Sequence, residues 1–200
     1  MGVFSTMITE SNQVLCLLGS PRRGGNSDFL TSHFCEQALT LGASIEKIAL
    51  SDLQYNGCIN LFRCKKDLDH CGQQDGLVPI LDKISKAEVL VLASPVYFTN
   101  VTGQLKLVID RLFSFLVPGY PTAENKSRLS PGRKLVFIQT QGEGENRYPD
   151  LLDIYSPGFR YLGYDHQYLI RAWGVREPGE VATRQEFLDQ CSQVAEEVFD

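Results

Sequence analysis

Short apolar segments alternate along this chain with segments whose apolar residues recur at helical spacing. The apolar segments cover residues 14–19, 44–50, 88–94, 134–140 and 167–172. The helical segments cover residues 26–41, 77–86, 102–116, 149–162 and 183–199, with Pro157-Gly158 as a candidate break in the fourth. Strands that are apolar along their length are buried on both faces, as in parallel sheets covered by helices. We therefore predict an α/β fold with a doubly wound, five-stranded parallel sheet and helices on both faces.

The size and composition of the chain fit one globular domain over residues 1–200. Of its 200 residues, 43% are hydrophobic and 22% are charged. Within this domain we predict a loose N-terminal segment over residues 1–12 and a cysteine-bearing loop over residues 51–75. The net charge of -5 disfavours nucleic acid as a partner, because binding the phosphates of a nucleic-acid backbone requires a basic protein face.

The targeting signals in the sequence are weak. No apolar run reaches the length of a membrane helix, and the N-terminus lacks the features of a secretory signal. We therefore expect no membrane association and a cytoplasmic location, where cysteines are reduced. Met1, Gly2 and Thr6 fit the short myristoylation pattern, which we interpret as a chance match.

The segment after the first predicted strand has the features of an anion site. Residues 19–27 read GSPRRGGNS and lead into a helix, whose first N–H groups attract negative charge. Ser20, Asn26 and Ser27 add side-chain donors, and Arg22 can form a bidentate pair with phosphate oxygens. The same segment also fits a plain glycine-rich turn before a capped helix.

Three other phosphate-binding patterns fit this segment less well. The dinucleotide fingerprint needs G-x-G-x-x-G, and the nucleoside triphosphate loop needs a lysine that is absent here. Cys16 and Arg22 have the spacing of a cysteine phosphatase. However, Cys16 lies in the interior of a predicted strand, where burial raises the pKa of a thiol and weakens it as a nucleophile.

A second candidate segment follows the third predicted strand. Residues 94–100 read SPVYFTN, and they place Tyr97 and Phe98 at the carboxyl end of an apolar strand. Together with Pro95 and Val96 these aromatic residues offer a flat apolar wall for a planar ring. The alternative is that both aromatic side chains pack under a neighbouring loop.

Together, GSPRRGGNS and the later SPVYFTNVTGQLKLVIDR resemble the NADPH-dependent FMN reductase group of the flavodoxin-like fold. Within that group the resemblance is to multimeric flavodoxins and iron-sulfur flavoproteins, and it covers residues 14–173. It implies that FMN is bound. By this resemblance the FMN phosphate is held by Ser20, Arg22, Asn26 and Ser27. The ring is lined by Pro95, Val96, Tyr97 and Phe98, and is closed over by residues 140–144, which include Thr140 and Gly142.

The resemblance implies an NAD(P)H oxidoreductase that passes electrons through FMN to a quinone, a flavin or another small acceptor. The flavin supplies the chemistry in such enzymes, so we name no catalytic side chain. A non-enzymatic FMN electron-transfer protein that docks to redox partners is the alternative. Relatives commonly complete the flavin pocket between subunits, which implies a homodimer or homotetramer. Residues 102–116, with Phe113 and Phe115, supply either that contact or the core, and Lys106, Asp110 and Arg111 are structural or interfacial.

The cysteine-bearing loop distinguishes the branches of this group. Iron-sulfur flavoproteins carry a C-x-x-C-x-x-C run, then a fourth cysteine and an acidic residue. This chain has Cys58, Cys64 and Cys71 before Asp75, with Leu61 at the middle position. A four-iron cluster needs four thiolates, so we expect no metal here. A zinc site that adds His70, another iron-sulfur species and a disulfide remain alternatives, whereas Cys16, Cys35 and Cys191 read as small core residues.

Overall fold

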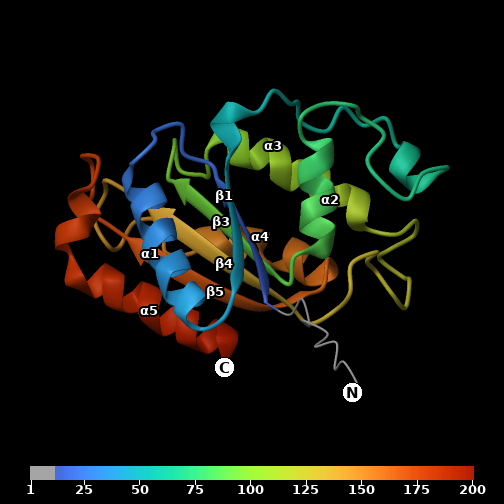
Figure 1. The fold of residues 1–200 in the computed structure, drawn as a ribbon. Coiled ribbons are helices and arrows are strands. Elements are labelled where there is room, and N and C mark those ends of the chain that lie inside the picture. The colour runs from blue at the N-terminus through green and yellow to red at the C-terminus, as the bar shows by residue number, and fades with distance from the viewer. Residues whose placement is uncertain (1–11) are drawn as a thin grey trace, which may run out of the picture.

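The computed structural model describes residues 12–200, and its centre is a five-stranded sheet (Figure 1). The strand order is β2-β1-β3-β4-β5, and all neighbouring pairs are parallel. The strands are β1 (Gln13–Leu18), β2 (Ser44–Ala49), β3 (Val89–Pro95), β4 (Arg133–Thr140) and β5 (Tyr164–Ala172). The predicted flavodoxin-like sheet is confirmed. The predictions for Met1, Gly2 and Thr6, and for the loose segment up to residue 11, lie outside the described residues.

Helices cover both faces of the sheet. On one face lie α1 (Asn26–Thr40) and α5 (Gln185–Phe199), and on the other lie α2 (Val78–Lys86), α3 (Gly103–Arg111) and α4 (Leu151–Tyr161) (Figure 1). Along β1, Cys16 faces the first pair of helices and Leu17 faces the second group. Because both directions are buried, nearly every position of the central strands must be apolar, which produced the continuous apolar runs.

The predicted helix over residues 102–116 is wrong in its second half. The α-helix ends at Arg111, and the short 3-10 helix η3 (Leu112–Phe115) follows it. Lys65 Nζ donates to the carbonyl oxygens of Phe113 and Leu116, both at 2.7 Å. Arg128 donates to the Leu116 carbonyl as well, at 2.6 Å. The last turn is held in its tighter form because side chains distant in sequence take up its carbonyl groups.

Two other element boundaries depend on solvent exposure. Pro157 lies inside α4 without breaking it, and it faces water, where the backbone carbonyl that it leaves without a donor can be hydrated. Strand β5 begins at Tyr164, three residues before the predicted start at residue 167. As an edge strand it exposes residues such as Asp165 and His166, so its first half lacks a continuous apolar run.

The cysteine-bearing loop, residues 51–75, is fastened to α3 by a buried arginine. It includes the 3-10 helices η1 (Leu50–Asp52, which begins one residue earlier) and η2 (Arg63–Lys65). Arg111 is 1% exposed and pairs with Asp75, its Nη1 lying 2.8 Å from Oδ2. The same nitrogen donates to the Asn56 carbonyl at 3.0 Å. Burial alone would raise the pKa of Asp75, but hydrogen bonds from Arg111 and from two backbone N–H groups hold that pKa below its usual value.

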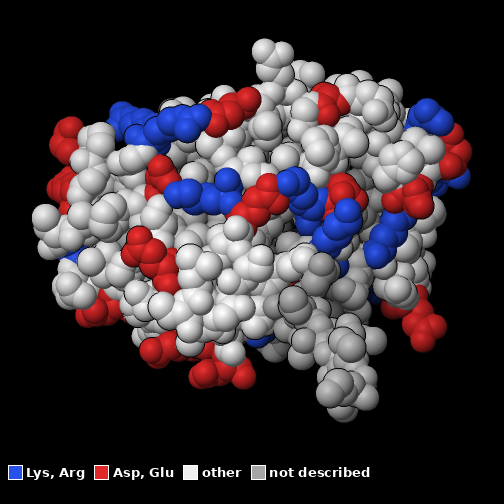
Figure 2. Space-filling model, in the orientation of Figure 1, with Lys and Arg blue, Asp and Glu red and all other residues white. Residues whose placement is uncertain are grey.

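None of the helices within residues 12–200 combines the length and the apolar character that crossing a bilayer requires. On the face of the molecule in Figure 2, Lys and Arg side chains are interspersed with Asp and Glu. That mixture agrees with the net charge of -5 and provides no continuous basic face on this side. In the core, Phe115 is buried and Phe113 is partly buried against the same cluster, so both contribute to packing within the chain.

Replacing Arg111 with Met should lower the free energy of unfolding by about 3–5 kcal/mol, because Asp75 would keep a charge without its main partner. Urea denaturation measures the loss. Lys106→Met is the matched control on α3, since its exposed pair with Asp110 contributes less than about 1 kcal/mol. The Arg111 effect should be complete above the ordinary carboxyl pKa of about 3.9 and should shrink as pH falls through the lower pKa of folded Asp75. Equal losses in the two variants would contradict the structural role of Arg111.

Candidate functional site

A cleft of about 220 Å³ opens at the carboxyl ends of β1, β3 and β4. It lies where parallel strands of this order leave a crevice between diverging loops. Nine of the ten predicted site residues line it, namely Ser20, Arg22, Asn26, Ser27, Pro95, Val96, Tyr97, Thr140 and Gly142. The structure therefore brings the segments after β1, β3 and β4 together around one space.

The start of α1 forms one wall of the cleft. The first helical hydrogen bond runs from the Phe29 N–H to the Gly25 carbonyl, at 2.9 Å. The N–H groups of Asn26, Ser27 and Asp28 therefore precede the bonds within the helix and carry the positive end of its dipole. Ser27 Oγ lies 2.8 Å from Thr140 Oγ1, so two hydroxyl groups meet at the floor of the cleft. This wall has the donors that an anionic group needs.

The position of this wall depends on a close approach at Gly19. Its N–H donates to the Ala93 carbonyl at 2.7 Å, and its carbonyl accepts from Thr102 Oγ1 at 2.8 Å. A Cβ atom at Gly19 would lie 2.9 Å from both Leu105 Cβ and Thr102 Oγ1. Thr102 also caps α3 by accepting from the Leu105 N–H. The loop after β1 is thus fixed against the loop after β3 at a point where only glycine fits.

The aromatic segment after β3 ends in a tight turn. The Tyr97 N–H donates to the Asn100 carbonyl at 2.8 Å, and the Asn100 N–H donates back at 3.1 Å. Between them Phe98 and Thr99 have φ values of 45° and 71°, in the left-handed region that favours glycine. Tyr97 lines the cleft, whereas Phe98 is fully exposed and lies outside its lining. The role assigned to Phe98 stays a prediction.

Sequence reasoning missed the fourth wall, which comes from the loop after β5. Val175, Arg176 and Pro178 line the cleft beside Gln141, which belongs to the predicted segment 140–144. The hydrogen bonding of the sheet continues into this loop, because the Val175 N–H donates to the Gln141 carbonyl at 3.0 Å. Arg176 Nε donates to the Gly142 carbonyl at 3.1 Å. The available signal was topological: β5 neighbours β4, so the loops that follow these strands leave the sheet side by side.

Asn26 joins this fourth wall to the start of α1. Its side-chain nitrogen donates to the Glu177 carbonyl at 2.9 Å, and its side-chain oxygen accepts from the Val181 N–H at 3.2 Å. Both bonds reach more than 150 residues along the chain. The Asn26 side chain therefore holds the loop after β5 in place, a structural task in addition to its predicted role.

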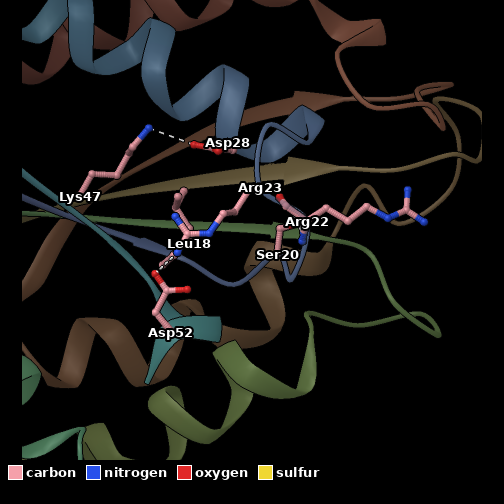
Figure 3. Close-up of a pocket in the computed structure, with 8 residues that line it drawn as sticks. Leu18, Ser20, Arg22, Arg23, Asp28, Lys47 and Asp52 are labelled. Atoms are coloured by element: carbon pink, nitrogen blue, oxygen red, sulfur yellow. Dashed lines mark hydrogen bonds and ion pairs between the residues drawn. The ribbon is translucent and has the colours of Figure 1, made fainter. Parts of the chain in front are cut away.

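A second pocket, of about 250 Å³, lies on the β2 side of the same loop (Figure 3). Its charges are largely paired, because Arg23 forms an ion pair with Asp52, and Lys47 Nζ lies 2.9 Å from Asp28 Oδ1. Burial would raise the pKa of Asp28, yet the Gly24 N–H and Lys47 keep that pKa low. The Arg22 side chain extends away from Lys47 and Asp52 (Figure 3). Of the two adjacent arginines, Arg22 is the one that also lines the cleft.

Residues 51–75 contain three cysteines, whereas a four-iron cluster needs four thiolates. Within residues 12–200 no three Cys, His, Asp or Glu side chains converge in a way that could hold a metal ion. Cys71 Sγ instead accepts from Arg111 Nε at 3.0 Å, so a cation that belongs to the chain occupies one side of this thiol. Cys58, Cys64 and Cys71 are all free thiols, and Cys58 is exposed. The absence of a metal from this loop stays a prediction.

The model of the NADPH-dependent FMN reductase family matches residues 12–147 of the chain. An iron-sulfur flavoprotein of Methanocaldococcus jannaschii is similar to part of the chain, with 36% identity over 99 residues. This match covers 50% of the chain and 51% of the relative, so it spans about half of the relative's length.

Two solved structures share the fold. An FMN-dependent NADH-azoreductase from Bacillus anthracis, in complex with FMN, has a TM-score of 0.69 at 20% identity, covering 94% of this chain and 100% of its own. An NAD(P)H:quinone oxidoreductase from Methanothermobacter marburgensis has a TM-score of 0.67 at 18% identity, covering 92% and 98%. At these identities the likeness concerns the arrangement of the strands and helices.

Gly19→Ala should destabilise the protein by about 1–3 kcal/mol, because the added methyl group must displace Leu105, Thr102 or the loop backbone. Thermal or urea unfolding measures this change. Gly103→Ala is the matched control, since a Cβ there meets no atom within 4 Å and lies at the start of a helix. Its stability should stay within about 1 kcal/mol of the parent or rise slightly. Indistinguishable variants would show that the close approach at Gly19 does not constrain the loop.

Proposed function

The chain belongs to the NADPH-dependent FMN reductase family, and from this premise we propose that it passes electrons from NADPH or NADH through bound FMN to a small acceptor. Quinones, free flavins and other small oxidants are the acceptor class that we assign to it. The observation that carries the proposal is that the phosphate-type loop (residues 19–27) and the aromatic segment (residues 94–100) converge on one cleft. We further propose that it acts in the cytoplasm as a homodimer or homotetramer.

The residues around the cleft fit the two ends of FMN. A phosphate monoester needs N–H and hydroxyl donors and a cation, which the start of α1, Ser20 and Arg22 provide. A flat heteroaromatic ring needs apolar walls, which Pro95, Val96 and Tyr97 provide. In this assignment the phosphate lies at the α1 end and the ring lies toward residues 95–97 and 140–142.

Bound FMN supplies the redox chemistry by accepting a hydride equivalent and passing its electrons on. The chain's own residues bind and orient the flavin. Ser27 and Thr140 hold the floor of the cleft through their shared hydrogen bond. Gly142 lets the chain pass close to Arg176, whose Cγ would lie 2.9 Å from a Cβ at that position. No side chain has to move a proton in this scheme, so specificity depends on the shape and access of the cleft.

An electron-transfer protein is the second candidate, favoured by the name of the iron-sulfur flavoprotein relative. Such a protein needs a path from the flavin to a partner, which an iron-sulfur cluster would supply. Residues 51–75 contain three cysteines where a four-iron cluster needs four thiolates, and Arg111 donates a hydrogen bond to one of them, Cys71. We therefore favour direct transfer to a small acceptor that enters the cleft.

In the decisive test, the purified chain is loaded with FMN, and NADPH or NADH is then added under anaerobic conditions. We expect the visible flavin absorbance to bleach, and then to return when a quinone such as benzoquinone is added. Steady turnover with quinone supports the reductase. Bleaching without turnover would favour the electron-transfer protein, and a chain that retains no flavin would refute both.

Arg22→Gln should weaken FMN binding by about 10- to 100-fold, because the charge-assisted hydrogen bond to the phosphate is lost. Fluorescence quenching during a flavin titration measures the dissociation constant. Riboflavin, which lacks the phosphate, should bind the parent and this variant equally. Arg23→Gln is the matched control, since Arg23 pairs with Asp52 outside the cleft and should leave FMN affinity unchanged. An equal loss for riboflavin would place the Arg22 effect away from the phosphate.

A further inference from the structure

Two buried thiols face each other between β1 and α1, the two elements that the phosphate-type loop (residues 19–27) connects. Cys16 Sγ on β1 lies 3.5 Å from Cys35 Sγ on α1, inside the core cluster between the sheet and α1. Cys16 is 0% exposed and Cys35 is 8% exposed. The third buried cysteine, Cys191, instead approaches the Leu30 carbonyl at 3.7 Å. Cys16 and Cys35 are therefore a thiol pair in contact, although neither residue belongs to the cysteine-bearing loop.

The two thiols are not equivalent. The hydrogen bond that Cys16 donates lowers the pKa of Cys35, and the Lys47 ammonium lowers it further against the effect of burial. Glu36 and Asp28, the acidic groups near Cys35, oppose this change. The pKa of Cys16 is raised by the same shared proton and by its complete burial. Of the two thiols, Cys35 is the one whose pKa is lowered and the one nearer to solvent, so it is the better candidate for the attacking sulfur.

We propose that Cys16 and Cys35 form a redox-active dithiol, which hydrogen peroxide closes to an internal disulfide. We further propose that this bond loosens the phosphate-type loop (residues 19–27), which joins β1 to α1. In the first step the Cys35 thiolate attacks one peroxide oxygen, which gives a sulfenic acid and releases hydroxide. In the second step the Cys16 sulfur displaces the hydroxyl group from Cys35, which forms the S–S bond and releases water. Two thiols are oxidised and one peroxide is reduced, and a small thiol reductant reverses the reaction.

The position of the pair links the bond to the cleft. A disulfide needs its sulfur atoms about 2.05 Å apart, so the Cys16 and Cys35 side chains, and to some extent the β1 and α1 backbones that carry them, must adjust from the present contact of 3.5 Å. The end of β1 cannot yield, because Gly19 is closely packed against Leu105 and Thr102. We therefore expect any backbone displacement on α1, whose first residues Asn26 and Ser27 line the cleft. The bond itself is independent of the proposed function, whereas its effect on flavin binding depends on it.

The first experiment treats the full-length, FMN-loaded protein with hydrogen peroxide and measures its intact mass and its peptide map without reduction. A Cys58→Ser, Cys64→Ser, Cys71→Ser background removes the cysteines of the loop. We expect a loss of about 2 Da that dithiothreitol reverses, with Cys16 and Cys35 in one linked peptide pair. Cys191→Ala is the matched control and should still form the link. A gain of about 16 or 32 Da on the Cys16 or Cys35 peptide, a different pairing or no link between these peptides in the folded protein would overturn the dithiol.

Single variants then test the roles of the two sulfur atoms. Cys16→Ala should stop the reaction at the Cys35 sulfenic acid, which dimedone traps, whereas Cys35→Ala should leave Cys16 unmodified. Trapping at Cys16 instead of Cys35 would reverse the assignment of the attacking thiol and contradict the proposed order. If either variant fails to fold, trapping in the parent protein at short times, followed by peptide mapping, identifies the first sulfur oxidised.

The second experiment titrates FMN into the reduced and the oxidised protein. We expect an affinity roughly tenfold weaker after oxidation, a size usual for coupled sites, restored by dithiothreitol. The Cys35→Ala protein should show no change on peroxide treatment. A disulfide that forms without altering FMN affinity would overturn the coupling. Failure of the reduced protein to bind FMN would instead refute the flavin function, while the mass measurement would still decide the dithiol.

Discussion

The close packing of Gly19 is the constraint on which the rest of the site depends. At this residue the chain leaves β1 with its backbone bonded to Ala93 and Thr102, and no side chain fits. Thr102 in turn caps α3, so one contact sets the end of β1, the loop after β3 and the start of a helix. The donors at the beginning of α1 and the wall at Tyr97 therefore face one space through backbone geometry, before any ligand is considered.

The pattern of burial decided how much of the fold could be predicted from the sequence. The central strands are enclosed on both faces, so their composition alone marks them. Element ends were less predictable, because they depend on distant partners. Lys65 and Arg128 donate hydrogen bonds to carbonyl groups in and just after η3, where the sequence predicts the end of an α-helix. These partners cannot be predicted from the residues near position 112. The start of β5 could not be predicted from the sequence either, because an edge strand is partly exposed and needs fewer apolar residues.

The candidate site could be predicted where one short segment both carries suitable side chains and directly follows a predicted strand. Residues 19–27 and 95–97 each carry their own signal, and strand order alone brings them together. Arg176 carried no such signal, because an isolated arginine in a loop is common and its place in the cleft follows from β5 lying beside β4. Phe98 shows the opposite relation: its residue type predicts contact with the ring, whereas the left-handed turn leaves its side chain fully exposed, so its role stays a prediction.

The attachment of residues 51–75 to α3 by Arg111 has a consequence for how this protein matures. The anchor consists of side chains encoded in the same chain, with Asp75 and the Asn56 carbonyl as its partners. A segment fastened in this way reaches its final shape as α3 docks, in a single cooperative event. A change that detaches α3 from the sheet would therefore also release this segment, together with its three thiols Cys58, Cys64 and Cys71.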